Sequence, residues 1–141
     1  MKVTQSIITV FLHETENPER VLDALTNCLG LNKGDFSLDI YEGYHGNHIL
    51  AYKAVLQKRK AEEFVEKLFR NMSKADIVFL ISSLDERIER NRLHLRLDKQ
   101  ALIAECKTVL RDGDDVVKVI LTFSGSSNEI ASELTEIAKS D

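Results

Sequence analysis

The stretch of residues 36–57 constrains the fold more than any other part of the sequence. Apolar and polar residues alternate over 36–41, as they do in a strand with one buried face. A short polar segment with two glycines follows at 43–47, and this composition is typical of a tight turn. Residues 48–57 then give a second run of strand type. The sequence therefore predicts an antiparallel hairpin here.

The segment before this hairpin predicts a strand followed by a helix. Residues 3–13 alternate and are rich in β-branched side chains, which favours a strand. Asn17 is a suitable helix cap and Pro18 fits the first helical position. Apolar residues then recur at helical spacing as far as Gly30, where we expect the helix to end.

The segment after the hairpin predicts further helices and strands. Helical periodicity returns over residues 59–71, and Ser73 is a candidate cap for another helix that reaches about residue 84. The charged run at 86–92 indicates a loop. The remaining elements are a strand at 92–97 with a basic outer face, a segment at 98–111 that fits a helical turn or a strand, a strand at 116–123 and a terminal helix at 127–140.

These elements follow the order β-α-β-β-α-α-β-(β)-β-α, which has no regular βαβ alternation. We therefore predict an α+β fold in which a mostly antiparallel sheet carries helices packed on one face. The chain has 141 residues, so we expect residues 1–141 to form a single domain. Apolar runs are too short for a membrane span and the N-terminus lacks a signal-peptide core, which predicts a cytoplasmic protein. In that compartment, Cys28 and Cys106 are expected to be reduced, small apolar side chains.

Charge is distributed unevenly along the chain. The formal net charge is −4, yet residues 53–111 hold 14 Lys/Arg against 9 Asp/Glu, while the flanks hold 5 against 14. A partner responds to the charges nearest to it, within a screening length of about 8–10 Å. The basic region is therefore either a solvated charge pattern or a surface for an anion. Lys58–Lys60 is its densest cluster and precedes a predicted helix, whose dipole disfavours cations at that end.

Few residues point to catalysis or to a metal. His45 and His48 form an HxxH pattern without an evident third ligand. Asp112, Asp114 and Asp115 crowd a predicted turn, where such side chains satisfy backbone groups. The sequence has no evident nucleophile–base pair and no phosphate-binding glycine loop. We expect no enzymatic activity, no catalytic residues, no metal site and no cofactor.

Two segments carry a specific pattern, Glu42–Ile49 and Leu95–Gln100. Together they resemble the two characteristic segments of an archaeal family described as RNA-binding or as predicted exosome subunits. The segment at 13–16 and the turn at 112–116 agree as well, so the resemblance spans most of residues 1–123. It implies a fold related to ribosomal protein L5 and to the double-stranded-RNA-binding domain.

The resemblance implies a non-enzymatic RNA-binding protein that acts through backbone electrostatics and shape. Its expected partner is structured or double-stranded RNA, with a link to RNA-degrading or ribosomal machinery. The rival interpretation is a protein-interaction or assembly component, such as a homodimer, that does not contact RNA directly. The candidate phosphate contacts are Lys53, Lys58, Arg59, Lys60, Arg92, Arg96 and Lys99, and the candidate groove contacts are Tyr44, His45 and Asn47.

Overall fold

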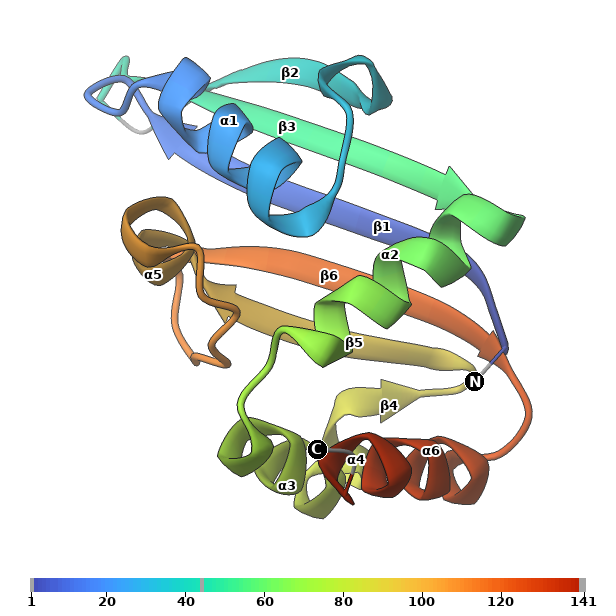
Figure 1. Ribbon diagram of the computed structural model, residues 1–141. Coiled ribbons are helices and arrows are strands. Elements are labelled where there is room, and N and C mark those ends of the chain that lie inside the picture. Colours follow the sequence, from blue (N-terminus) through green and yellow to red (C-terminus); the bar gives the residue numbers. More distant parts are fainter. Residues whose placement is uncertain (1, 44, 140–141) are drawn as a thin grey trace.

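The computed structural model describes residues 2–43 and 45–139, in which helices lie against one β-sheet (Figure 1). None of the helices in the described part of the chain is long and apolar enough to cross a membrane. The strands are β1 (Lys2–His13), β2 (Phe36–Glu42), β3 (His48–Gln57), β4 (Ile88–Glu89), β5 (Arg92–Asp98) and β6 (Val116–Ser124). The helices are α1 (Pro18–Leu29), α2 (Lys58–Arg70), α3 (Lys74–Ser82), α4 (Leu84–Arg87), α5 (Lys99–Glu105) and α6 (Ser127–Lys139), with a 3₁₀ turn at Lys33–Asp35.

The sheet has the strand order β2-β3-β1-β6-β5-β4. Every neighbouring pair is antiparallel. The predicted α+β class with an antiparallel sheet is therefore confirmed. β1 lies near the middle, where it pairs with β3 on one side and with β6 on the other.

One face of the sheet forms the core with the helices. Ile8 lies opposite Ala54 and Val119 in the strand register, and all three side chains are fully buried. α1 and α2 lie in front of the strands in Figure 1, with α2 crossing β1. α3, α4 and α6 extend the helical layer beyond β5. The assignment of residues 1–141 to a single domain stays a prediction.

The helix ends follow the sequence signals. The Asn17 side chain accepts a hydrogen bond from the Glu19 amide at 3.0 Å, and Pro18 opens α1. Gly30 ends the helix with φ of 71°, a left-handed conformation that glycine adopts without steric cost. Ser73 caps α3 by accepting from the Asp76 amide at 3.1 Å. These three caps confirm the predicted boundaries.

One region differs from the expected loop, and the structure settles the conformation of another that the sequence left ambiguous. The charged run at 86–92, predicted as a loop, includes the end of α4 and the short strand β4. The ambiguous segment at 98–111 is helical first, because the Asp98 carboxylate accepts from the Ala101 amide at 3.0 Å and starts α5. It is extended afterwards, where the Asp98 amide donates to the Val109 carbonyl at 2.8 Å. The helical alternative therefore holds for Lys99–Glu105, whereas Thr108 and Leu110 form isolated β-bridges and not a strand.

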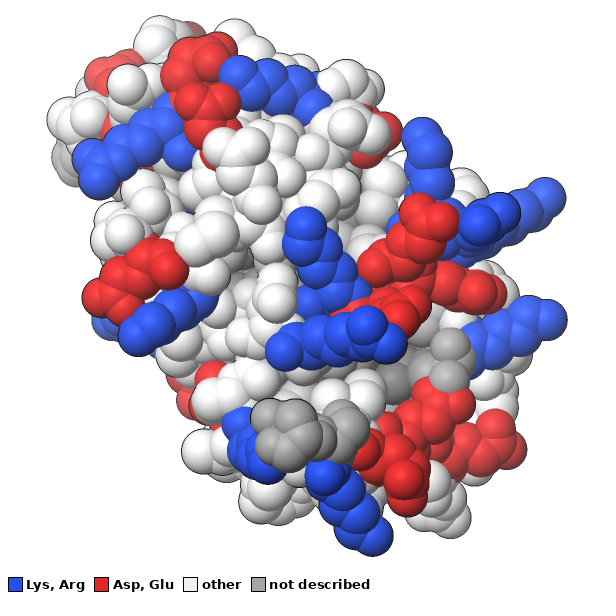
Figure 2. Space-filling model, viewed as in Figure 1, with Lys and Arg blue, Asp and Glu red and all other residues white. Residues whose placement is uncertain are grey.

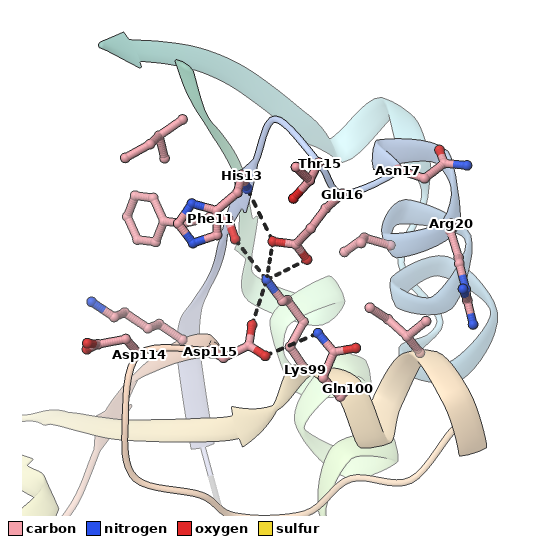
Figure 3. A pocket seen from close by; sticks show the side chains of 14 residues that line it. Phe11, His13, Thr15, Glu16, Asn17, Arg20, Lys99, Gln100, Asp114 and Asp115 are labelled. Carbon is pink, nitrogen blue, oxygen red and sulfur yellow. Dashed lines mark hydrogen bonds and ion pairs between the residues drawn. The ribbon is translucent and has the colours of Figure 1, made fainter. Parts of the chain in front are cut away.

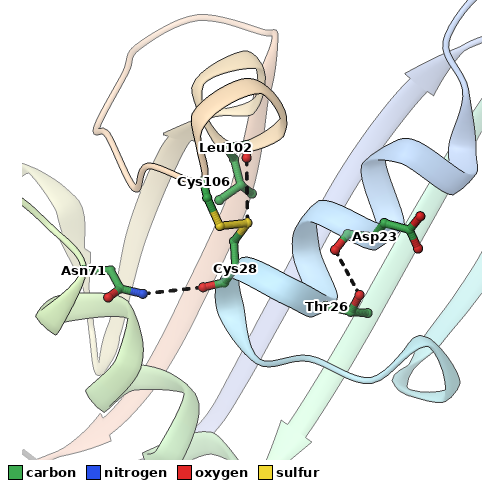
Figure 4. Close-up of a disulfide and its surroundings, with 6 residues drawn as sticks. All are labelled: Asp23, Thr26, Cys28, Asn71, Leu102 and Cys106. Atoms are coloured by element: carbon green, nitrogen blue, oxygen red, sulfur yellow. Dashed lines mark hydrogen bonds between the residues drawn. A yellow bond between two sulfur atoms is a disulfide. The ribbon is translucent and has the colours of Figure 1, made fainter.

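The expectation of two reduced cysteines is wrong. Cys28 and Cys106 form a disulfide that joins the ends of α1 and α5 (Figure 4). Their Cα atoms lie 5.4 Å apart, within the range that a disulfide spans. Cys28 is buried as predicted, whereas Cys106 is exposed. The two residues are 78 positions apart, so only the packing of the two helices brings them together.

Candidate nucleic-acid interface

The second face of the sheet is exposed. Side chains alternate along each strand, so the residues between the core positions of β1 and β3 point away from the helices. Phe11 on β1 is 39% exposed and Val55 on β3 is 43% exposed. Tyr41 on β2 is 53% exposed and belongs to the same face by its pairing with Ile49. This open face offers an apolar and aromatic surface to a partner.

Three cations lie in one row across the open face. The strand register places Lys53, Thr9, Lys118 and Arg96 side by side on β3, β1, β6 and β5. Neighbouring strands are about 4.8 Å apart, so this row spans about 14 Å. Lys53 and Arg96 are exposed and Lys118 is half-buried. We call Lys53, Lys118 and Arg96 the basic row.

The basic row contains an unfavourable pair that an anion would relieve. Lys118 and Arg96 are direct cross-strand partners, and like charges in that position destabilise a sheet. The Lys118 ammonium lies 5.4 Å from the centre of the Phe11 ring, a weak cation–π contact. Arg96 donates through one terminal nitrogen to the Gly113 carbonyl at 2.8 Å, which leaves other donors of its guanidinium group for a partner.

Two further rows, toward one end of the sheet, add one more cation. The next row is Val55, Ile7, Ile120 and His94, and the one after it is Gln57, Gln5, Thr122 and Arg92. Over these three rows, four Lys or Arg side chains stand against one carboxylate, that of Glu89 on β4, which is the cross-strand partner of Arg92. The predicted residues Lys53, Arg92 and Arg96 thus share one face.

The helix-covered side has a different charge pattern. Figure 2 shows Lys and Arg interspersed with Asp and Glu on that side. Arg59 pairs with Glu63 at 3.2 Å and Arg70 pairs with Glu66 at 2.7 Å. Such exposed pairs contribute little stability, but they reduce the field available to an external anion. The basic row is therefore the better candidate for contact with phosphate.

The other predicted contacts lie at opposite ends of β3. The turn at 43–47 precedes this strand, and Lys58–Lys60 follows it. Ten residues separate the two segments, or about 33 Å in a strand. Lys60 also lies 3.9 Å from an Asp35 carboxylate oxygen. The structure therefore does not bring the turn and the Lys58–Lys60 cluster together.

The turn itself is held by backbone contacts. Gly46 has φ of 75° and donates to the Gly43 carbonyl at 3.2 Å, while the Gly43 amide donates to the Asn47 carbonyl. His45 and Asn47 are exposed, and Tyr44 lies outside the described residues. No group of three His, Cys, Asp or Glu residues in the described part of the chain is placed to hold a metal ion.

Lys99 is buried, which contradicts its predicted contact with phosphate. Its side chain is 2% exposed, and its ammonium lies 2.8 Å from Glu16 Oε2 and 2.8 Å from Asp115 Oδ1. It also donates to the Phe11 carbonyl at 3.2 Å (Figure 3). Burial opposes the charge, but the hydrogen bonds with Asp115 and Glu16 outweigh it and hold the pKa of Lys99 above its ordinary value. Lys99 therefore joins β1, the following turn and α5.

Two carboxylates near Lys99 have pKa values below the ordinary value of aspartate. The hydrogen bond from Lys99 lowers the pKa of Asp115, and Gln100 Nε2 also donates to Asp115 at 3.1 Å. The Ala101 backbone amide lowers the pKa of Asp98, with help from Arg111 at 3.1 Å. Both carboxylates are therefore ionised at neutral pH. Asp98–Gln100, part of the second segment that resembles the archaeal family, therefore has a structural role: it starts α5 and fixes it to β1.

A family model described as RNA binding matches residues 6–123. This chain belongs to that RNA-binding family. It is 34% identical over 119 residues to RNA-binding protein PAB1135 from Pyrococcus abyssi (strain GE5 / Orsay), a match that covers 79% of this chain and 76% of the relative.

Two solved structures are similar to this member of the RNA-binding family. Protein SSO0741 from Sulfolobus solfataricus has a TM-score of 0.82 and 29% identity, covering 95% of this chain and 96% of that one. Mth689 from Methanothermobacter thermautotrophicus, a DUF54 protein, has a TM-score of 0.74 and 24% identity, covering 99% and 100% of the two chains. At 24% identity, the similarity to Mth689 concerns the fold alone.

The open face of this RNA-binding family member includes two residues that the sequence did not single out as candidates, Lys118 and Phe11. Lys118 and Phe11 were assigned to strands without a functional role, although both occupy open-face positions. Alternation along each strand could have indicated both. Lys118 interrupts an otherwise apolar stretch of β6, and Phe11 falls between the core positions of β1, so both side chains are expected on the face away from the core. Their proximity depends on the pairing of Thr9 with Lys118, which no local pattern reveals.

Proposed function

We propose that this chain binds RNA through its phosphate backbone on the open face of the sheet. The observation that carries the proposal is the strand register, because it aligns Lys53, Lys118 and Arg96 on one uncovered face. Lysine and arginine contacts to phosphate supply most of the sequence-independent affinity for nucleic acids. Family membership supports the same class of partner.

Arg92 extends this surface toward one end of the sheet. It lies one row beyond His94 on the same side of β5. Lys58–Lys60 follows Gln57 at that end of β3 and would meet a longer RNA. His45 and Asn47, at the opposite end of β3, would contact RNA there.

The proposed role is binding without catalysis, in the cytoplasm. A connection with RNA degradation or with ribosomal machinery, and a structural relation to ribosomal protein L5, stay predictions from the resemblance. Binding through an exposed sheet does not require any of them.

The experiment compares two variants of equal charge. One replaces Lys53, Lys118 and Arg96 with alanine, and the matched control replaces three exposed cations on the helix-covered side, Lys67, Arg70 and Lys139. Fluorescence anisotropy with labelled RNA at low salt measures the affinity of each. Contacts between a charged group and phosphate are worth about 1 kcal/mol each at such exposure, so the first variant should lose about 3 kcal/mol, or about 100-fold.

The control should lose much less, because only its net charge changes. Circular dichroism verifies that both variants fold. Equal losses in the two variants would refute local binding on the open face, and no binding of the unmodified protein at low salt would refute the proposed function altogether.

A second candidate function is protein assembly, and two exposed apolar areas favour it. On α3, Val78 is 58% exposed and Phe79 is 50% exposed. On the edge strand β2, Ile40 is 62% exposed, and edge strands are sites where another chain can pair. Light scattering across a concentration series tests this function. A stable dimer that Ile40→Lys disrupts would support it, whereas a monomer at all concentrations would contradict self-assembly.

A further inference from the structure

A pocket of about 690 Å³ adjoins the basic row (Figure 3). It lies where the end of β1 meets the starts of α1 and α5, and Phe11 and Lys118 border both the pocket and the open face. Lys99 closes part of its wall and is already bound by two carboxylates. The pocket therefore belongs to the same surface as the basic row but has a chemistry of its own.

The charged side chains of the pocket balance. Three carboxylates line it, and so do three cations: Glu16, Asp114, Asp115, Arg20, Lys99 and Lys118. The Lys99 ammonium is already bound by Glu16 and Asp115. Carboxylates accept hydrogen bonds, so a neutral group that presents N–H donors matches this lining.

The other side of the pocket is apolar and aromatic. Phe11, which is 39% exposed, lines this side, and Ile49 and Ile103 also line the pocket. Aromatic rings bind nucleobases by stacking, with about 1–3 kcal/mol per base. A flat apolar surface beside carboxylate acceptors matches a nucleobase, which has two apolar faces and an edge of polar atoms.

The position of the pocket also matches RNA on the basic row. Phe11 follows Thr9 by two residues on β1, about 7 Å along the strand, and Thr9 lies between Lys53 and Lys118 in that row. An RNA strand whose phosphates contact the basic row therefore brings one of its bases to the pocket. A base inside a duplex is stacked and paired, so an unpaired base enters at the lowest cost.

We infer that the chain binds single-stranded RNA and takes one unpaired base with an exocyclic amino group into this pocket. Adenine and cytosine carry such an amino group and uracil does not. The inference rests on the proposed function, because the basic row holds the phosphates of the same strand.

The test uses labelled single-stranded oligomers of adenylate, cytidylate and uridylate, each about ten nucleotides long, and an RNA duplex. Anisotropy titrations measure their affinity for the whole chain. The adenylate and cytidylate oligomers should bind about tenfold more tightly than the uridylate oligomer, the discrimination that one well-placed base contact gives. The duplex should bind more weakly than adenylate.

The variant Phe11→Leu removes the ring but keeps an apolar side chain. It should weaken adenylate binding about tenfold and reduce the difference between adenylate and uridylate. Phe79→Leu is the matched control, because Phe79 is also exposed and also contacts a cation, Arg87 at 5.4 Å, but lies on α3. It should change neither value.

Equal affinities for the three oligomers, or tighter binding of the duplex, would overturn the inference. So would an unchanged adenylate affinity in a folded Phe11→Leu variant. If the basic-row variant still loses affinity in those cases, the proposed function stands and only the pocket assignment falls. If no RNA binds at low salt, both fall together.

Discussion

Replacing Lys99 with methionine should destabilise the protein without removing a phosphate contact. Methionine keeps the apolar stem of the side chain, so the main loss is the ammonium that binds Glu16, Asp115 and the Phe11 carbonyl. Breaking a buried ion pair costs about 3–5 kcal/mol, because the remaining charges lose their partner.

The lower end of this range applies to Lys99. The Glu16 and Asp115 side chains are 21% and 51% exposed, so water compensates in part for the lost ammonium. We expect a loss of about 3 kcal/mol, which lowers the melting temperature by roughly 10 °C in a domain of this size.

Urea denaturation followed by circular dichroism measures the stability of this variant. Lys107→Met is the control, since Lys107 is 68% exposed and pairs with the exposed Glu105; it should change stability by less than about 0.5 kcal/mol. The salt dependence of RNA affinity gives the second readout. Its slope should be unchanged in the Lys99 variant, because each phosphate contact contributes about −0.7 to −0.9 to that slope. A variant as stable as the parent, with a slope reduced by one contact, would refute the structural role of Lys99.

Three further predictions concern stability. Reducing the Cys28–Cys106 disulfide, which closes a separation of 78 residues, should cost about 2–4 kcal/mol. Calorimetry with and without a reductant measures this, with a double serine variant as the control that the reductant should not affect, and a parent protein whose stability is unchanged by the reductant would contradict it. The lowered pKa values of Asp98 and Asp115 contribute stability that is present above the unfolded pKa of about 4 and is lost as the pH falls through the lower folded values. The urea midpoint should therefore fall as the pH is lowered, and it should fall less in a variant with both residues changed to asparagine. Gly46→Ala should cost about 1 kcal/mol because φ is 75°; a midpoint equal to that of the parent would argue against this turn geometry.

Local sequence signals predicted the elements well. The hairpin, the cap at Asn17 and the helix end at Gly30 each depend on residues close together in the chain. The basic outer face of the strand with Arg92 and Arg96 also followed from alternation alone. Propensity and periodicity are local properties, so they specify such features directly.

The parts that were missed depend on contacts between distant segments. Lys99 is buried because Glu16, which is 83 residues away, and Asp115 come to it in the folded chain. The disulfide has the same origin, since the packing of α1 beside α5 brings Cys28 to Cys106. Periodicity shows that Lys118 lies in a strand but not that this strand pairs with β1.

The salt dependence of RNA affinity tests the central claim most directly. The unmodified protein and the variant with alanine at Lys53, Lys118 and Arg96 are titrated with single-stranded RNA at a series of salt concentrations. If these three side chains contact phosphates, the slope of log K against log salt should become shallower by about 2 in the variant, at about 0.7 per contact. An identical slope in a folded variant would contradict RNA binding on the open face.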